Sequence, residues 1–473
     1  MGLFNRIYLK NEEEIELLRQ SADIVGRTLA EVAKVIAPGV PCTYLDKIAD
    51  EFIRDNKAEY IELQKLLTAH KALAPENGGD GEWDKCAALE EFLRAHEITN
   101  LERFDAPDSR AKNGARPNLI ATIPSKRAAS SNSSASSDSS SPAASGADNN
   151  SAIWVIAHLD VVPVGNPADW KTDPWTVVEQ DGKLFGRGVE DNQQGLCSAF
   201  AAAWAFVKND IVPERTIKLL FVADEEVGSK YGMIWLLQNR PELFGKDDYF
   251  LIPDGGDAQG RTIEVAEKNV LWLEFTVSGK QCHGSRPDEG LNACLAANRL
   301  SLALYKGLHK KFCAKDKLFE PATCTFEPTK RAANVDGVNI IPGSDVFCFD
   351  CRVLPRYKNE QVLKTIDAII AAEQKKSGVR ITYKILQNAQ SKATDKNAPL
   401  VQALAAAIKE AHGLDAQTIG IGGGTVAAEL RNLGHDCVVW SSLDETAHMP
   451  NEYCIVDNLI KDAQTLALLF SGS

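Results

Sequence analysis

Short apolar runs and longer segments with helical periodicity alternate along much of the chain. Apolar runs that predict buried strands end near His158 and span 217–223 and 249–253, and the segments 192–208 and 231–239 predict helices. This alternation is typical of an α/β layer built on a mostly parallel sheet.

The pattern changes after residue 270. The next segments predict strand, helix, strand, strand, helix and strand, over 271–278, 291–311, near Thr323, near Val346, 360–375 and 380–386. This order is typical of a ferredoxin-like domain. Since the α/β pattern resumes over 395–473, we expect an α/β fold: a mixed, mostly parallel sheet with helices on both faces, interrupted by an inserted ferredoxin-like α+β domain. The expected divisions are 59–269 and 391–473 for the two parts of the sheet domain and 270–390 for the insertion.

Two segments depart from this plan. Residues 1–58 carry helical periodicity over 11–37 and 45–55, and 7–58 resembles the N-terminal helices of type I methionine aminopeptidases. None of the five metal ligands of that family follows, so this segment is expected to lack that chemistry. Residues 125–150 are almost entirely Ser, Ala, Asn, Asp and Gly, which predicts a disordered surface loop. The apolar runs on either side of this loop are expected to form neighbouring strands.

Composition and charge narrow the classes of partner. A chain of 473 residues that is 44% apolar can fill two cores, and its net charge of -13 argues against a nucleic-acid partner. No apolar run reaches the roughly 20 residues needed to cross a bilayer, which argues against a membrane protein. The eleven cysteines are scattered and odd in number, and no secretory signal precedes them, so we expect reduced thiols in the cytoplasm.

Five residues of types that commonly bind metal follow predicted strands, where open α/β sheets place their sites. They are His158, Asp191, Glu226, Asp254 and His448. Taken singly, three of these blocks have a plainer explanation: a structural histidine in His158-Leu-Asp160, a helix cap at Asp191, and a solvated loop at 224–226. Together they favour a site for two divalent ions about 3.5 to 4 Å apart, with zinc, cobalt or manganese suited to imidazole and carboxylate ligands.

These blocks, in this order, resemble the co-catalytic zinc hydrolases that include aminoacylases, glutamate carboxypeptidases, peptidase-V-type dipeptidases and succinyl-diaminopimelate desuccinylase. The resemblance covers residues 59–473 and implies a catalytic sheet domain with an inserted lid and dimerisation domain. It implies that Asp191 bridges two ions whose further ligands are the other four residues. It also implies that Asp160 orients His158 and that Glu225 is the general base.

The resemblance also implies residues that contact the substrate. His283, in Gln281-Cys-His-Gly-Ser-Arg-Pro, is similar to a lid histidine that donates to the oxyanion and reaches the site of a partner chain. Asn339 and Arg352 are similar to positions that hold substrate. The loop that contains Gly423, Gly424 and Thr425 is similar to one whose N–H groups hold a terminal carboxylate, with an ordinary Gly-rich turn as the alternative.

The sequence therefore predicts a metal-dependent hydrolase that cleaves an amide bond of a small, carboxylate-bearing N-acyl amino acid or dipeptide. The expected cofactor is two divalent ions, with zinc favoured, and the small domain, 270–390, is expected to form a homodimer. A non-catalytic small-molecule binding protein that retains the fold is the alternative. The sequence does not select the acyl group or peptide.

Overall fold

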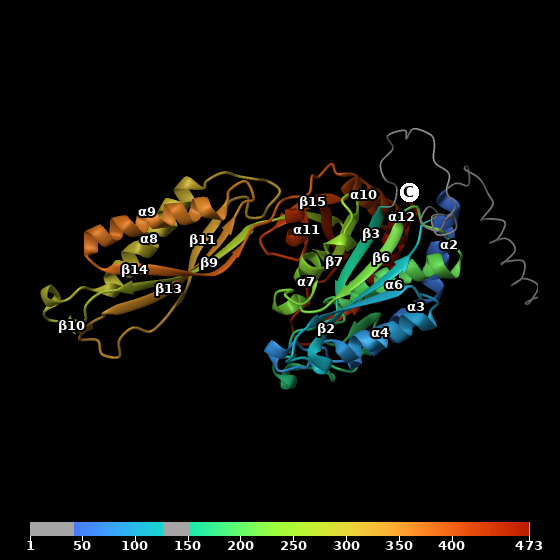
Figure 1. The fold of residues 1–473 in the computed structure, drawn as a ribbon, viewed down its shortest axis with the longest axis horizontal. Coiled ribbons are helices and arrows are strands. Elements are labelled where there is room, and N and C mark those ends of the chain that lie inside the picture. The colour runs from blue at the N-terminus through green and yellow to red at the C-terminus, as the bar shows by residue number, and fades with distance from the viewer. Residues whose placement is uncertain (1–41, 126–150, 473) are drawn as a thin grey trace, which may run out of the picture.

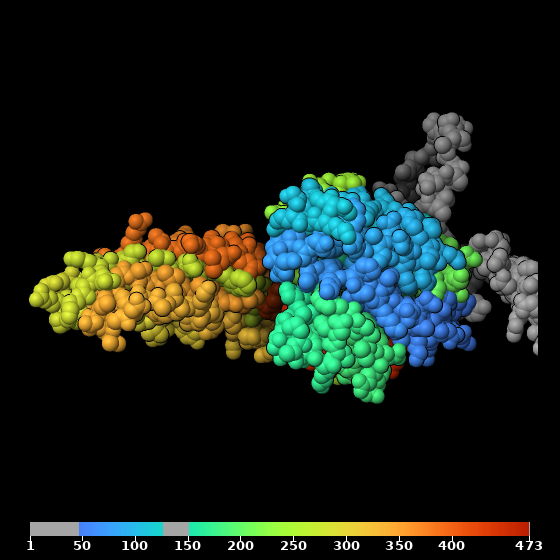
Figure 2. Space-filling view, turned by 90° about the horizontal axis from the view of Figure 1, so that it is seen from below, coloured from blue at the N-terminus to red at the C-terminus, as the bar shows by residue number. Residues whose placement is uncertain are grey.

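The computed structural model describes residues 42–125 and 151–472. The expected helix over 11–37 and nearly all of the Ser-rich loop lie outside these residues. Within the described residues, two lobes lie along the long axis of the molecule (Figures 1 and 2). The larger lobe holds the start and the end of the described chain, and the smaller lobe holds the segment between them.

The larger lobe is built on an eight-stranded sheet. Its strands, in spatial order, are β1 (Leu101–Pro107), β2 (Ala115–Ile123), β6 (Thr216–Val222), β3 (Ala152–His158), β7 (Tyr249–Asp257), β16 (Asp436–Ser442), β8 (Thr262–Glu267) and β15 (Gln417–Ile421). The four strands from β6 to β16 are mutually parallel, as are β8 and β15. The β1–β2, β2–β6 and β16–β8 pairs are antiparallel. The sheet is mixed and mostly parallel, as expected.

One expected strand pairing is wrong. The apolar runs on either side of the Ser-rich loop form β2 and β3, but β6 lies between them. Strand β6 pairs antiparallel with β2 and parallel with β3, and every residue of β3 is buried. A strand in the middle of a sheet gains hydrogen bonds and packing on both sides, which proximity in the chain does not supply.

Helices cover both faces of this sheet (Figure 1). On one face lie α2 (Cys42–Asp55), α3 (Lys57–Ala69), α4 (Trp83–Ala95), α6 (Gln193–Lys208), α10 (Pro399–His412) and α12 (Val456–Ser471). On the other face lie α7 (Met233–Asn239) and α11 (Ala427–Leu433). Strand β3 shows why two layers form: Ile153 and Val155 enter the first core, whereas Trp154 and Ile156 enter the second.

Helix α2 belongs to the predicted N-terminal segment 1–58, yet it packs into the core of the larger lobe. Ile53 is fully buried and Ala49 nearly so, and both are members of the main core. The Phe52 ring meets Trp204 of α6 edge to face, with 4.8 Å between ring centroids. The described part of this segment therefore contributes to the stability of the sheet domain, while the division after residue 58 stays a prediction.

The smaller lobe has the predicted β-α-β-β-α-β order. Its elements are β9 (Asn269–Ser278), α8 (Ala293–Lys311), β11 (Thr325–Arg331), β13 (Ser344–Val353), α9 (Asn359–Ser377) and β14 (Arg380–Ala389), with strand order β11-β13-β9-β14 and every pairing antiparallel. Alternate residues of β9, such as Leu273 and Phe275, are buried in the lobe's core, whereas Trp272 and Ser278 are exposed. This arrangement confirms the predicted ferredoxin-like insertion in an α/β fold.

Short elements complete the chain. They are β4 (Val178–Gln180), β5 (Lys183–Phe185), β10 (Cys282–His283), β12 (Ile340–Ile341), β17 (Tyr453–Ile455) and the 3-10 turns η1 (Pro75–Asn77), η2 (Lys112–Gly114), η3 (Pro167–Asp169), η4 (Glu225–Val227), η5 (Pro241–Leu243) and η6 (Pro287–Glu289). Among the described helices, none combines the length and the apolarity that crossing a bilayer requires.

Candidate active site

The five predicted metal ligands gather at the carboxyl edge of the large sheet. His158 is the last residue of β3, Asp254 lies in β7, and Glu226 lies in η4, directly after β6. Asp191 precedes α6, and His448 lies in the loop that follows β16. Parallel strands end at the same edge, so side chains far apart in the sequence meet there.

Asp191 lies between the two histidines. Its Oδ1 is 2.9 Å from His158 Nε2, and its Oδ2 is 3.0 Å from His448 Nε2. On one side, Asp254 Oδ1 is 3.8 Å from His158 Nε2; on the other, Glu226 Oε2 is 3.1 Å from His448 Nε2. The distances thus pair His158 with Asp254 and His448 with Glu226, and Asp191 is common to both pairs.

The protonation equilibria of this cluster are strongly perturbed. Burial raises the pKa of Asp254 well above its usual range, and burial raises that of Glu225 to about 7, since carboxylates with little access to solvent are costly to ionise. Burial acts to lower the pKa of His158, but its hydrogen bonds to Asp160 and Asp191 outweigh that effect and raise it well above 6.5. A hydrogen bond to Asp191 is the largest cause that raises the pKa of His448 to about 10. Excess negative charge in a confined space therefore attracts positive charge to this site.

The donor set fits divalent cations. His158, Asp191 and Glu226 offer ligand atoms that all lie within 4.8 Å of one another, and so do His158, Glu225 and Asp254. The buried Oε1 of Glu226 has no hydrogen-bond partner among the described residues. Imidazole nitrogen and carboxylate oxygen together suit zinc, cobalt or manganese, and an unpaired buried carboxylate oxygen is what a bound cation would satisfy.

Asp160 contacts both His158 and the loop that carries Glu225. His158 Nδ1 lies 2.9 Å from the backbone oxygen of Asp160 and 3.6 Å from its carboxylate. The two carboxylate oxygens accept the backbone N–H groups of Glu225 and Glu226, at 3.0 and 3.1 Å. Asp160 is therefore placed to hold the Glu225 loop as well as the His158 ring, and the sequence indicated only the second contact.

A buried ionic network lies behind the same loop. Arg116 is fully buried, and its Nε donates to Glu82 Oε2 at 2.6 Å while its Nη2 also contacts Glu82. Arg116 Nη1 is 3.0 Å from Asp224 Oδ1. Asp224 has φ of 68° and leads directly into Glu225, so this network fixes a left-handed residue next to the predicted base.

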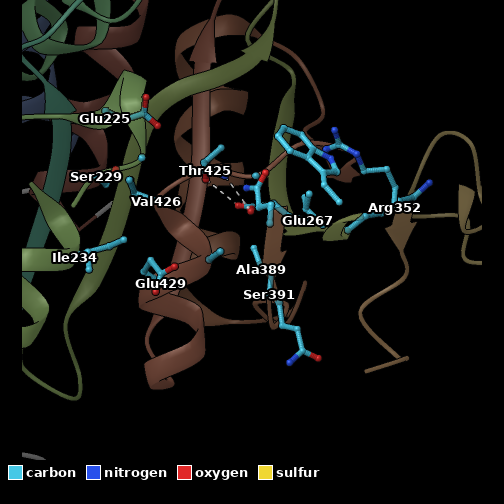
Figure 3. Close-up of a pocket in the computed structure, with 18 residues that line it drawn as sticks. Glu225, Ser229, Ile234, Glu267, Arg352, Ala389, Ser391, Thr425, Val426 and Glu429 are labelled. Atoms are coloured by element: carbon cyan, nitrogen blue, oxygen red, sulfur yellow. Dashed lines mark hydrogen bonds between the residues drawn. The ribbon is translucent and has the colours of Figure 1, made fainter. Parts of the chain in front are cut away.

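A cavity of about 300 Å³ adjoins the cluster (Figure 3). Glu225 and Arg352 lie at opposite sides of it, with Thr425 and Glu267 between them. Of the residues predicted to bind substrate, Arg352, Gly424 and Thr425 line this cavity, whereas Gly423 is not among its lining residues.

Two of the lining residues, Thr425 and Arg352, make hydrogen bonds that were not expected. Glu267 Oε2 accepts the Thr425 N–H at 3.0 Å, and Glu267 Oε1 accepts the Thr425 hydroxyl at 2.8 Å. The Arg352 guanidinium donates to both oxygens of Asp350, at 2.8 and 3.1 Å, and to the Gly422 carbonyl at 2.8 Å. A substrate carboxylate would therefore have to compete with groups of the chain for Arg352 and for the Thr425 N–H.

His283 and Asn339 do not join the cluster of their own chain. Both are exposed, and β10, which carries His283, lies at the end of the smaller lobe that is farthest from the large sheet (Figure 1). Residue 339 adjoins β12, the partner strand of β10. Ser285 donates its backbone N–H to His283 Nδ1 at 3.1 Å, so a neutral His283 carries its proton on Nε2 and can act as a donor there. The structure therefore does not bring His283 to the ligand cluster of its own chain.

The fold and the ligand cluster together define an α/β metal-dependent hydrolase with an inserted lid domain. The chain belongs to the peptidase family M20/M25/M40, because the model of that family matches residues 154–471. The predicted family resemblance and the hydrolase class are thereby confirmed.

Relatives of known sequence or structure extend this assignment. An uncharacterized metallohydrolase of Methanocaldococcus jannaschii is 38% identical over 423 residues, which cover 86% of this chain and 97% of the relative. A succinyl-diaminopimelate desuccinylase of Nitratiruptor sp. is 26% identical over 62% of this chain and 77% of its own length. The crystal structure of the YxeP protein of Bacillus subtilis, described as a dinuclear metal-binding peptidase, has a TM-score of 0.57 at 15% identity, covering 88% of this chain and 97% of its own.

Proposed function

We propose that the chain is a two-metal amidohydrolase that cleaves the amide bond of a small N-acyl amino acid or dipeptide. The observation that carries the proposal is the position of Asp191 between His158 and His448, with Asp254 and Glu226 on either side. One carboxylate shared by two histidine–carboxylate pairs is the donor set that two neighbouring divalent ions require.

The residues divide between two ions as their distances indicate. His158 and Asp254 would hold one ion, His448 and Glu226 the other, and Asp191 both. Two divalent ions, when bound, acidify water and polarise the amide carbonyl. Zinc is the favoured metal, and cobalt or manganese suit the same donors.

Glu225 is proposed as the general base. It lies next to the ligand Glu226, and its backbone is held by Asp160. Its carboxylate would take a proton from the attacking water and deliver that proton to the leaving amine nitrogen, so that Glu225 ends the reaction as the carboxylate that began it. A non-catalytic binding protein would not need this carboxylate at the edge of the cavity.

The substrate class is inferred from the cavity. A volume of about 300 Å³ suits a ligand of a few residues at most. The cations Arg352 and Lys268 line the cavity together with Gly424, which supports a substrate that bears a carboxylate. The desuccinylase and peptidase relatives act on bonds of this type, as their names state.

The test compares two neighbouring substitutions. Purified chain, stripped with a chelator and reloaded with Zn²⁺ or Co²⁺, is assayed against dipeptides and N-acetyl, N-succinyl and N-carbamoyl amino acids. Glu225→Gln should lower kcat by about 100- to 10,000-fold while two ions remain bound. Glu226→Gln should lose metal as well as activity. Full activity of Glu225→Gln would exclude Glu225 as the base. A wild-type chain that is inactive on the whole panel would favour the binding-protein alternative.

We further propose that two copies of the chain pair through the smaller lobe, so that His283 of each serves the other's site. Helix α8 exposes Leu295, Leu302 and Tyr305 along one face, an apolar surface that a second copy could cover. Mixing a Glu225→Gln chain with a His283→Ala chain tests this arrangement, because one site in each mixed dimer then has both groups. Activity should recover to about a quarter of wild type for random pairing. No recovery would show that His283 does not act across chains.

We also infer a cytoplasmic location. Every cysteine whose side chain the structure describes is free. Free thiols are typical of a reducing compartment.

A further inference from the structure

Glu190, the neighbour of Asp191, holds the loop that carries His448. Its side chain is almost fully buried, and its Oε1 accepts the Asp444 N–H at 2.6 Å. Its Oε2 accepts the Thr446 N–H and the Thr446 hydroxyl, the latter at 2.7 Å. Three donors that lie two to four residues before His448 thus converge on one carboxylate more than 250 residues earlier in the chain.

Glu452 makes the converse set of contacts. It is fully buried, and its Oε2 accepts from Arg187 Nη1 at 2.7 Å and from the Gly188 N–H at 2.9 Å. Its Oε1 accepts the N–H groups of Glu190 and Asp191, at 3.0 and 3.1 Å. A carboxylate four residues after His448 therefore holds the loop that carries Asp191.

These reciprocal contacts hold a loop that packing alone fixes only weakly. His448 keeps 57% of its side chain exposed, so little packing fixes its position. Its loop also contains three non-glycine residues in the left-handed region, Glu445, His448 and Asn451, with φ of 58°, 64° and 61°. Such a conformation persists only when surrounding contacts determine it.

We propose that Glu190 and Glu452 are positioning residues that set the metal affinity of the site. Glu190 fixes the loop that carries His448, and Glu452 fixes the loop that carries Asp191. The inference rests on the proposed two-metal function. Because Asp191 is shared, loosening its loop through Glu452 affects both ions. Loosening the His448 loop through Glu190 affects only the ion held by His448 and Glu226. Substitutions of the two residues should therefore weaken the binding of different numbers of ions.

The experiment is a titration of the chelator-stripped chain with Co²⁺, followed by the visible absorption of bound cobalt and by calorimetry. Glu190→Gln should weaken one of two binding steps by about 10- to 100-fold, and Glu452→Gln should weaken both, as substitutions behind metal ligands do. Thr446→Val removes the hydroxyl that donates to Glu190 and that also contacts the backbone N–H and carbonyl of Tyr453, and it should weaken the same step as Glu190→Gln, by less. It carries the test if a glutamine variant does not fold.

The matched control is Asp248→Asn. Asp248 is also buried and accepts three donors, from Ala152, Trp154 and Gly245, but it lies at the amino edge of the sheet, away from the ligands. This variant should lose stability and keep both cobalt affinities. If Glu190→Gln, Glu452→Gln and Thr446→Val bind both ions as tightly as wild type, the positioning role is refuted and the two-metal function stands. If the wild-type chain binds no cobalt, the proposed function fails and the inference fails with it.

Discussion

Replacing Arg116 with methionine should be one of the most destabilising single changes in the larger lobe. The side chains of Arg116 and Glu82 are fully buried, and that of Asp224 is 2% exposed. Methionine fills much of the volume of arginine but leaves two carboxylates without their counter-charge. Breaking a buried ion pair from one side costs about 3 to 5 kcal/mol, far more than the loss of an exposed pair.

The measurement is urea unfolding followed by tryptophan fluorescence, with Lys65→Met as the control. Lys65 pairs with Glu62 at 2.8 Å on the surface, and its loss should cost less than about 1 kcal/mol. The double variant Arg116→Met, Glu82→Met removes one uncompensated charge and should recover part of the loss. A cost below about 1 kcal/mol for Arg116→Met, or a double variant less stable than the single one, would refute this reasoning about the buried charges.

Three further predictions concern the core, a buried acid and the ions. Ile53→Ala should cost about 2 to 5 kcal/mol in urea unfolding, because Ile53 is fully buried in the main core, and a negligible cost would separate α2 from that core. Burial raises the pKa of Glu264 from 4.5 to about 8, so the folded chain retains a proton that the unfolded chain releases. The free energy of unfolding should therefore fall as pH rises between these values, by at most about 1.4 kcal/mol per pH unit. Glu264→Gln should reduce this pH dependence, as urea midpoints measured over the same pH range would show. Co²⁺ at about 100 times the Kd of each of the two sites should add about 2.7 kcal/mol per bound ion to the free energy of unfolding, and Asp191→Ala should abolish this gain.

Local patterns in the sequence were sufficient for the element types and for a candidate ligand set. The strand that ends at His158 is a continuous apolar run, the helix that follows Asp191 is a longer apolar segment, and both were found within a residue or two of their predicted bounds. The candidate ligands could be selected because metal chemistry restricts residue type and because strand ends are local features. Glu190 and Glu452 adjoin two of these ligands, but nothing in their local sequence indicates which loop each one holds.

The sequence by itself determined the two-lobed α/β plan, the family and the residue types that can bind two cations, since these depend on periodicity and on side-chain chemistry. Only the tertiary structure decided that β6 lies between β2 and β3, that Asp191 faces both histidines, and that His283 is remote from its own chain's ligands. Those outcomes depend on contacts between segments separated by tens to hundreds of residues. The free energy of such contacts comes from the burial and hydrogen bonding of the assembled chain, which no local pattern records.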